Sequence, residues 1–184
     1  VKAEFELNTA QVVKIMSNNC VANRIEKESF RTAMRSVKAE FELNTAQFVT
    51  FMSNGCVANR IEDESFRTAM RSVKAEFELN TAQFVTFMSN GCVANRIEDE
   101  SFRTAMRSVK AEFELNTAQV VKIMSNGCVA NRIEKESFRT AMRSVKAEFE
   151  LNTAQFVTFM SKDCVADRIE KESFRTAMRS VKAE

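Results

Sequence analysis

Five copies of one tetrapeptide carry the residues of this chain that could do chemistry. The copies read SNNC, SNGC, SNGC, SNGC and SKDC, so only the middle pair changes. The pairs are Asn18-Asn19, Asn54-Gly55, Asn90-Gly91, Asn126-Gly127 and Lys162-Asp163. Their second members present an amide, a bare backbone or a carboxylate, which share no packing role and differ in what they donate and accept. The variation therefore indicates a change of chemistry at one fixed place.

Catalytic and metal chemistry have no credible residues. The chain contains no histidine and no CxxC pair, so a zinc or iron–sulfur site lacks a ligand set. No nucleophile–base pair and no glycine-rich phosphate loop is found. The cysteines occur once per repeat, at Cys20, Cys56, Cys92, Cys128 and Cys164, which predicts a reduced, cytosolic-type chain. We expect no enzyme, no cofactor, no metal and no small-molecule substrate.

A period of 36 residues positions the varied pairs. The segment VKAEFELN begins at Val1 and returns at Val37, Val73, Val109 and Val145, and VKAE recurs at Val181. The sequence thus reads as one array over 1–184. Its repeats are 1–36, 37–72, 73–108, 109–144 and 145–180, and 181–184 opens a further repeat. Such periods are typical of units that stack on their neighbours, which predicts a superhelical solenoid.

Helices are expected to build each repeat, because the chain has no proline and only three glycines. Asn8 and Gln11 form the pattern of a capping box, which predicts a short first helix from Thr9 to about Met16. A longer second helix is expected to begin near Val21 and to end between Arg35 and Glu40. Its apolar face would contain Phe30, Ala33, Met34 and Val37. The fold class is therefore all-α, with two helices per repeat and the varied pair in the loop between them.

The variable pair also has a purely structural interpretation. Asn-Gly is a good turn, in which Gly55, Gly91 and Gly127 would supply positive φ at little cost. Lys162-Asp163 is explained less well, because it is no special turn former. The other main differences, such as Val12 and Ile15 against Phe48 and Phe51, are exchanges on an apolar face and indicate packing alone.

The segment 7–26, LNTAQVVKIMSNNCVANRIE, resembles the first part of a transcription-activator-like effector (TALE) repeat. Both contain a leucine, a Gln-Val-Val run, an apolar stretch, a serine, a variable pair and a second helix. In that family the pair after the serine specifies a base, and Asn-Asn and Asn-Gly are two of its common forms. The chain resembles a divergent member of the kind reported from marine bacteria, because the likeness fades outside this segment.

This resemblance implies binding to double-stranded DNA, one base per repeat, in the major groove. The second residues of the pairs would face the bases: Asn19, Gly55, Gly91, Gly127 and Asp163. The first residues would brace the loop by bonding a carbonyl of the first helix: Asn18, Asn54, Asn90, Asn126 and Lys162. Glycine leaves room for the thymine methyl, asparagine can donate to a purine N7, and aspartate can accept from the cytosine amino group. The implied site is 5′-(G or A)-T-T-T-C-3′.

Contacts to the DNA backbone would differ from those of the family. Where TALE repeats have two glycines and a lysine after the pair, this chain has Cys20-Val21 and Ala22. The amides of Cys20 and Val21 are the first candidates for holding phosphate. The side-chain candidates are Asn23, Arg24, Asn59, Arg60, Asn95, Arg96, Asn131, Arg132 and Arg168. A salt bridge from Arg24 to Glu28, four residues on, is an equally good prediction for that arginine.

Two other functions stay open at this point. Helical repeats of the PPR and PUF type read RNA one base per repeat, although their reading residues lie elsewhere in the repeat. A protein-binding solenoid of the TPR or HEAT type is the third interpretation, and it fits the net charge of only +2, since nucleic-acid binders usually carry a clear basic excess.

The sequence predicts no association with a membrane, and it predicts association of arrays through their ends. No run of eighteen apolar residues and no secretory leader is visible, so no membrane partner is expected. Near-identical repeats without caps leave an apolar face at each end. We expect these faces to allow end-to-end stacking of arrays.

Overall fold

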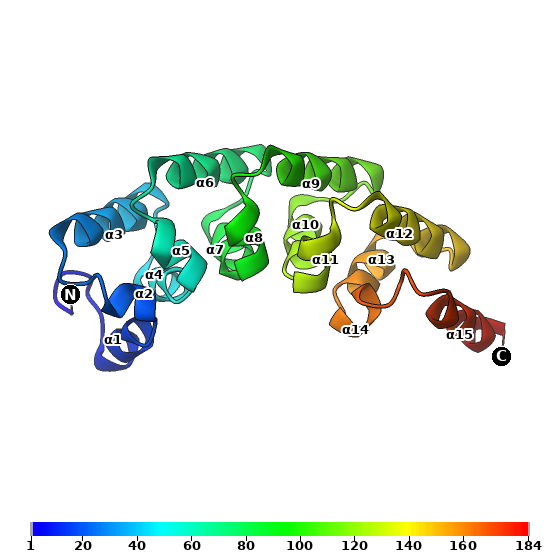
Figure 1. Cartoon of the computed structure of the whole chain (residues 1–184), viewed down its shortest axis with the longest axis horizontal. Coiled ribbons are helices and arrows are strands. Elements are labelled where there is room, and N and C mark those ends of the chain that lie inside the picture. The colour runs from blue at the N-terminus through cyan, green and yellow to red at the C-terminus, as the bar shows by residue number, and fades with distance from the viewer. Residues whose placement is uncertain (1, 184) are drawn as a thin grey trace. The chain divides into compact units, whose positions relative to one another are not determined.

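The computed structural model describes residues 2–183 and contains fifteen helices and no strand within them (Figure 1). The all-α prediction is therefore confirmed. Contacts divide the chain into two compact units, Val1–Glu98 and Asp99–Glu184. The boundary falls inside the third repeat, at a place with no linker signal, because the residues around it recur in every copy.

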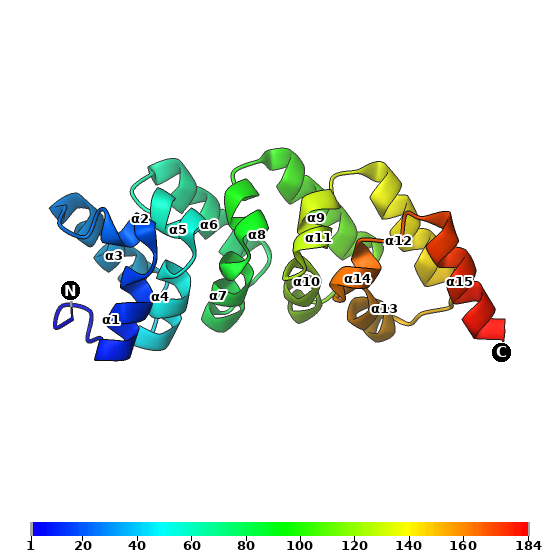
Figure 2. The ribbon, with the colours of Figure 1, turned by 60° about the horizontal axis from the view of Figure 1, so that its bottom comes forward.

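The first unit contains eight helices. They are α1 (Thr9–Met16), α2 (Asn19–Ala22), α3 (Glu28–Glu40), α4 (Thr45–Met52), α5 (Gly55–Arg60), α6 (Glu64–Glu76), α7 (Thr81–Ser89) and α8 (Gly91–Arg96). The helices α1, α4 and α7 lie side by side, and so do α2, α5 and α8 (Figure 2).

The second unit contains seven helices. They are α9 (Glu100–Glu112), α10 (Thr117–Met124), α11 (Gly127–Arg132), α12 (Glu136–Glu148), α13 (Thr153–Met160), α14 (Asp163–Ala166) and α15 (Glu172–Ala183). Here α10 contacts α13, and α11 contacts α14.

The prediction of two helices per repeat was wrong, because the expected second helix is broken into a short helix and a long one. In the first repeat α2 ends at Ala22 and α3 begins at Glu28. Arg31 holds the break by donating from Nη1 to the carbonyls of Ile25, at 3.0 Å, and Glu26, at 3.2 Å. Arg139 does the same for Ile133 and Glu134 in the second unit. These carbonyls would otherwise lack a helical partner.

The capping boxes that begin the first helices are present as predicted. The N–H of Gln11 donates to Asn8 Oδ1, and the N–H of Asn8 donates to Gln11 Oε1, both at 2.9 Å. The same reciprocal pair begins α4, α7, α10 and α13. The predicted bounds Thr9–Met16 are confirmed.

The turn after each of the long helices α3, α6, α9 and α12 contains a residue that the sequence gives no reason to expect there. After α3, Glu42 has a φ of 54°, in the left-handed region. The N–H of Leu43 bonds the carbonyl of Lys38 at 2.9 Å, and the N–H of Glu42 bonds that of Ala39 at 3.1 Å. These two bonds form a Schellman motif, which usually places glycine at this position. Equivalent glutamates have positive φ throughout: Glu6, Glu78, Glu114 and Glu150.

Phenylalanines and the apolar face of each long helix form the core. The predicted face of α3 is confirmed, since Phe30, Ala33, Met34 and Val37 are buried. Phe41 stacks on Phe84 of the next repeat, with ring centroids 4.6 Å apart. In the second unit, Phe113 and Phe156 make the same contact at 4.5 Å. One repeat therefore completes the core of the repeat before it.

Arginines on the long helices hold carboxylates of two successive long helices. Arg71 of α6 pairs with Glu64 of its own helix, at 2.9 Å, and with Glu40 at the end of α3. Arg143 pairs in the same way with Glu136 and Glu112 in the second unit. Hydrogen bonds from Arg71 and Arg67 lower the pKa of Glu64 below its ordinary value of 4.5. Hydrogen bonds from Arg143 and Arg139 lower the pKa of Glu136 likewise.

These ion pairs predict a loss of stability in acid. A carboxylate whose pKa is lowered by folding stabilises the folded state above its unfolded pKa, and the contribution disappears as pH falls through the folded value. We expect the melting temperature followed by circular dichroism to change little above about pH 5 and to fall as pH drops below about 4. The variant Arg71→Gln should show a smaller fall. A melting temperature that stays constant into strong acid would contradict the prediction.

Candidate nucleic-acid interface

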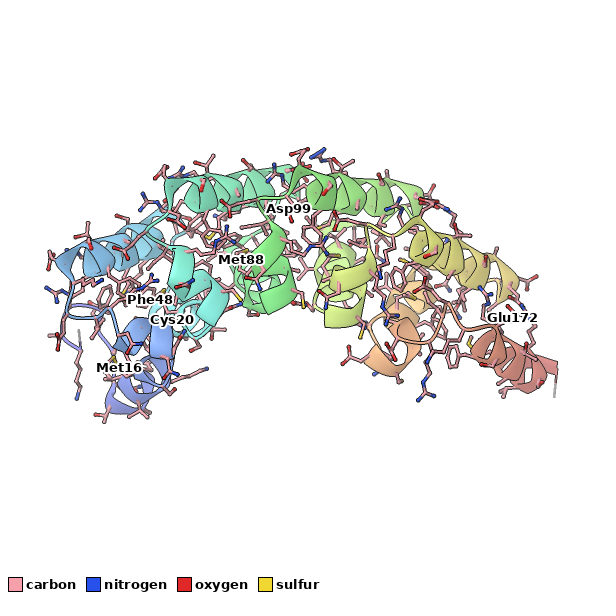
Figure 3. The ribbon with its side chains drawn as sticks, in the orientation of Figure 1. Met16, Cys20, Phe48, Met88, Asp99 and Glu172 are labelled. Atoms are coloured by element: carbon pink, nitrogen blue, oxygen red, sulfur yellow. The ribbon has the colours of Figure 1, made fainter. Side chains whose placement is uncertain are left out.

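The variable pairs lie at the beginning of the second short helix of each repeat rather than in a loop. In the first repeat Asn18 is the N-cap of α2 and Asn19 is its first residue. Both stand in the sequence between Met16 and Cys20, which are labelled in Figure 3. Asn54 and Gly55 have the same places in α5. None of the three glycines has positive φ. The interpretation of Asn-Gly as a turn was therefore wrong.

The first residue of the pair braces successive repeats with both ends of its amide. Asn18 Oδ1 accepts from the N–H of Cys20 at 3.0 Å, and Asn18 Nδ2 donates at 2.8 Å to the carbonyl of Met52. Met52 ends the first helix of the following repeat, whereas the expected bond was to the first helix of the same repeat. Asn54 makes the equivalent bond to Met88, also at 2.8 Å.

Asn126 makes the same contacts and is the most buried of these asparagines. It is the one buried polar residue within the described part of the chain, with 4% of its surface exposed. Its Nδ2 donates to the carbonyl of Met160 at 3.0 Å, and its Oδ1 accepts from Cys128 at 2.8 Å and Val129 at 3.3 Å. Asn90 accepts from Cys92 at 2.9 Å. Lys162 caps α14 without a side-chain bond.

The second residue of the pair is not required by the fold in this way. Asn19 and Asp163 are exposed, and the three glycines are half-buried. A methyl group built on Gly55 would lie 3.9 Å from Asn18 Oδ1, and one on Gly91 would lie 3.7 Å from Cys56 Sγ. Both are ordinary contacts, so the fold would accept a side chain at either position. Glycine at these two places is not demanded by backbone angle or by space.

The amides expected to hold phosphate are already used inside the protein. In the first repeat the N–H of Cys20 bonds Asn18 Oδ1, and the N–H of Val21 bonds the carbonyl of Asn18 at 2.9 Å. In the fourth repeat Asn126 Oδ1 takes both equivalent amides. An incoming phosphate would therefore have to compete with the cap.

The arginine after the pair joins repeats instead of pointing to solvent. Arg24 donates to the carbonyl of Asn59 at 2.8 Å and to its side-chain oxygen at 2.5 Å, and lies 3.6 Å from Glu62. The predicted pair with Glu28 is not the one observed, since Glu28 pairs with Arg31 and Arg35.

The arginines at the same place in later repeats make similar contacts. Arg60 pairs with Glu98, bonds the carbonyl of Asn95 at 3.4 Å, and lies over the ring of Phe66. Arg132 bonds Asp167 at 2.5 Å and lies 3.8 Å from Glu170. These guanidinium groups therefore hold the following repeat.

The remaining candidates for the DNA backbone differ in access. The asparagine row is exposed along the short helices, at Asn23, Asn59, Asn95 and Asn131. Arg168 is exposed, and Arg96 is half-buried on α8. Asp167 replaces the asparagine in the last repeat and accepts from Arg132. Exposed amides can donate to phosphate oxygens but bring no charge.

The described residues also bear on metal binding, free thiols and membrane spans. Within 2–183 no three histidine, cysteine, aspartate or glutamate side chains gather in a way that could hold a metal ion. All five cysteines are free thiols, and Cys164 is the exposed one among them. No described helix has the length and apolar character needed to cross a membrane.

The fold and the row of varied residues define a class, which is an all-α protein built of helical repeats. Comparison with known proteins does not narrow this class. No protein-family model matches the chain, and no curated protein or solved structure is detectably similar to it.

Proposed function

We propose that the chain binds double-stranded DNA and reads one base per repeat in the major groove through the second residue of each pair. In this proposal the repeats stack into a superhelix with a period of 36 residues. The reading residues are Asn19, Gly55, Gly91, Gly127 and Asp163. The expected site is 5′-(G or A)-T-T-T-C-3′.

The observation that supports this proposal most is that the two residues of a pair differ in their structural role. The first residue is held by the cap and by the bond to the following repeat, as Asn54 shows. The second residue varies, and the fold requires no glycine at Gly55 or Gly91. Because neither the backbone angle nor the available space demands glycine at these positions, we look for the reason for its recurrence outside the fold. Room for a thymine methyl is such a reason.

Phosphate contacts in this proposal are few. Arg24, Arg60 and Arg132 are committed to the next repeat, so the exposed asparagine row and Arg168 would make the contacts. Neutral donors release no counterions, so the affinity should fall only gently with salt. Five repeats should also bind weakly, and two chains joined in register into ten repeats are the better material for the test.

The sharpest test is the exchange Gly91→Asn in such a ten-repeat array. The third position should then prefer a purine over thymine, by about 5–100-fold, because asparagine can donate to purine N7 while filling the space of the thymine methyl. Gel shift against four duplexes that differ only at the third base gives the measurement. Gly91→Ala is the matched control, because it adds a Cβ without a donor and should not favour purines.

Equal affinity of the unmodified array for matched and scrambled duplexes at moderate salt would refute the proposal. Single-stranded RNA and an RNA–DNA hybrid of the same sequence belong in the same experiment. A base preference confined to single-stranded RNA would instead support an RNA-reading repeat protein.

A further inference from the structure

One position on the first helix of each repeat carries either lysine or threonine. The lysines are Lys14 in the first repeat and Lys122 in the fourth, and the threonines are Thr50, Thr86 and Thr158. All are exposed except Thr50, which is half-buried. The five helices begin with the same capping box, so they differ here in charge rather than in the way they fold.

This position is close to the variable pair. The exposed residues of α10 and its C-cap are Ala118, Lys122 and Ser125, whose spacing places them on one face of the helix. Gly127 follows Ser125 after one residue, and α11, which it begins, packs against α10. At a rise of about 1.5 Å per residue, Lys122 lies on the order of 8 Å from Gly127. The lysine is therefore a neighbour of the second residue of the pair.

The ammonium group of Lys122 is available to a ligand. Its Nζ donates to Thr158 Oγ1, at the same position of the next repeat, at 3.3 Å. An ammonium has three donors, so two remain for another partner. Within the described part of the chain neither Lys122 nor Lys14 pairs with a carboxylate. The two lysines differ in this from the arginines that follow the pairs, which hold the next repeat.

The threonines at the same position present no such group. Thr50 Oγ1 donates to the carbonyl of Ala46 at 3.1 Å, and Thr86 Oγ1 donates to that of Ala82 at 2.9 Å. Each hydroxyl hydrogen is therefore used by its own helix. The repeats thus fall into two kinds, which either have or lack a free cation beside the variable pair.

We infer that Lys14 and Lys122 bind phosphates of the DNA while the variable pairs face its bases. This inference rests on the proposed function. The major groove is about 12 Å wide, so phosphates flank a base-reading residue at roughly half that distance. The flexible four-carbon stem of a lysine can carry its ammonium across such a gap. The first and fourth repeats then attach the array to the DNA backbone, and the other three lack a cation at this position.

These contacts make the affinity depend on salt. Each lysine that neutralises a phosphate releases counterions and adds about 0.9 to the slope of log affinity against log salt. The asparagines add nothing to this slope, because they are neutral. The gentle fall with salt expected from neutral donors is therefore the expectation for an array without the two lysines.

Replacing Lys14 and Lys122 by threonine in both halves of the ten-repeat array tests the inference. Threonine is native to this position in the other repeats, so circular dichroism should show unchanged helices. The affinity for the matched duplex should fall about tenfold or more at low salt, and the slope should become shallower by about 3–4. The preference among the four duplexes that differ at the third base should remain. Gel shift over a range of salt concentrations measures all three quantities.

The opposite exchange, Thr86→Lys, should add a phosphate contact in the third repeat. Thr86 is exposed, so the fold accepts the longer side chain. The affinity should rise about 2–5-fold at low salt, and the slope should become steeper by about 2, because each half of the array gains one lysine. A gain cannot result from unfolding, so this variant separates phosphate binding from a loss of structure. An unchanged affinity and slope would contradict the inference.

Lys74→Thr together with Lys146→Thr is the control with the same loss of charge. These lysines are half-buried in the last turns of α6 and α12. Both helices lie apart from the first and short helices of their own units (Figure 1). The control array should keep the salt slope of the original.

The outcomes separate this inference from the proposed function. A base preference with a salt slope that the exchange of Lys14 and Lys122 changes no more than the control does would overturn the inference alone. A shallower slope in an array without base preference would support the phosphate contacts and refute base reading. Absence of binding to any duplex would overturn both.

Discussion

Replacing Asn126 by alanine is expected to lower the free energy of unfolding of the second unit by about 2–4 kcal/mol. Loss of an asparagine N-cap costs roughly 1 kcal/mol. The carbonyl of Met160 also loses its donor from Asn126 at a buried site, and leaving a buried acceptor unsatisfied costs about 1–3 kcal/mol. Urea denaturation followed by circular dichroism gives the value, and hydrogen exchange at the Cys128 amide should report the loss of the cap.

Two further variants separate the contributions in this prediction. Asn126→Ser keeps a capping oxygen, so it should recover about 1 kcal/mol of the loss. Asn131→Ala removes an exposed asparagine on the same helix, α11, and should change stability by less than about 0.5 kcal/mol. If Asn126→Ala were as stable as Asn131→Ala, the bond between repeats would contribute nothing and the bracing role would be wrong.

Local signals in the sequence predicted the parts of the repeat that depend on local physics. The capping box of Asn8 and Gln11 fixed the start of the first helix, and the spacing of Phe30, Ala33, Met34 and Val37 fixed the buried face of the long one. Both rules operate within one or two turns of helix. They need no knowledge of the neighbouring repeat.

Features that depend on the neighbouring repeat could not be predicted in this way. The sequence predicts Glu28, four residues on, as the partner of Arg24, because only such local partners are visible in a sequence, yet Arg24 bonds Asn59 in the next repeat. The bond from Asn18 to the carbonyl of Met52 also joins two repeats, so it could not be predicted from local sequence either. The break before Glu28 has one weak signal in the sequence, which is Glu28 itself, because acidic residues often begin a helix. The same residue is equally compatible with the interior of a longer helix.

The interpretation of the variable pair also depends on contacts that the sequence does not show. Asn-Gly read alone indicates a turn, and the structure places it across a helix start with negative φ at the glycine. The asparagine is kept by a bond to another repeat, and the residue after it is free of structural demands. A sequence can show that the pair varies, but the reason why its first member is asparagine in four of the five copies lies in contacts between repeats, as the bonds of Asn18, Asn54 and Asn126 show.

Replacing four strained glutamates by glycine is expected to stabilise the chain by about 2–4 kcal/mol in total. Glu42, Glu78, Glu114 and Glu150 all have φ between 52° and 54°. A left-handed conformation costs a residue with a side chain roughly 1–2 kcal/mol, and glycine returns about 0.5–1 of this through its greater freedom when unfolded. The net gain is about 0.5–1 kcal/mol at each position. Denaturation of the quadruple variant in urea measures it.

The same positions offer a control that keeps the loss of charge but not the relief of strain. The quadruple alanine variant removes the same carboxylates and still carries a Cβ, so it should gain little or nothing. The four side chains form no ion pair among the described residues, so neither variant breaks one. Equal stability of the glycine and alanine variants would show that the backbone at these joints is not strained. A gain for glycine alone would show that burial of residues such as Phe41 and Leu43, on either side of Glu42, forces the chain to reverse there despite the cost.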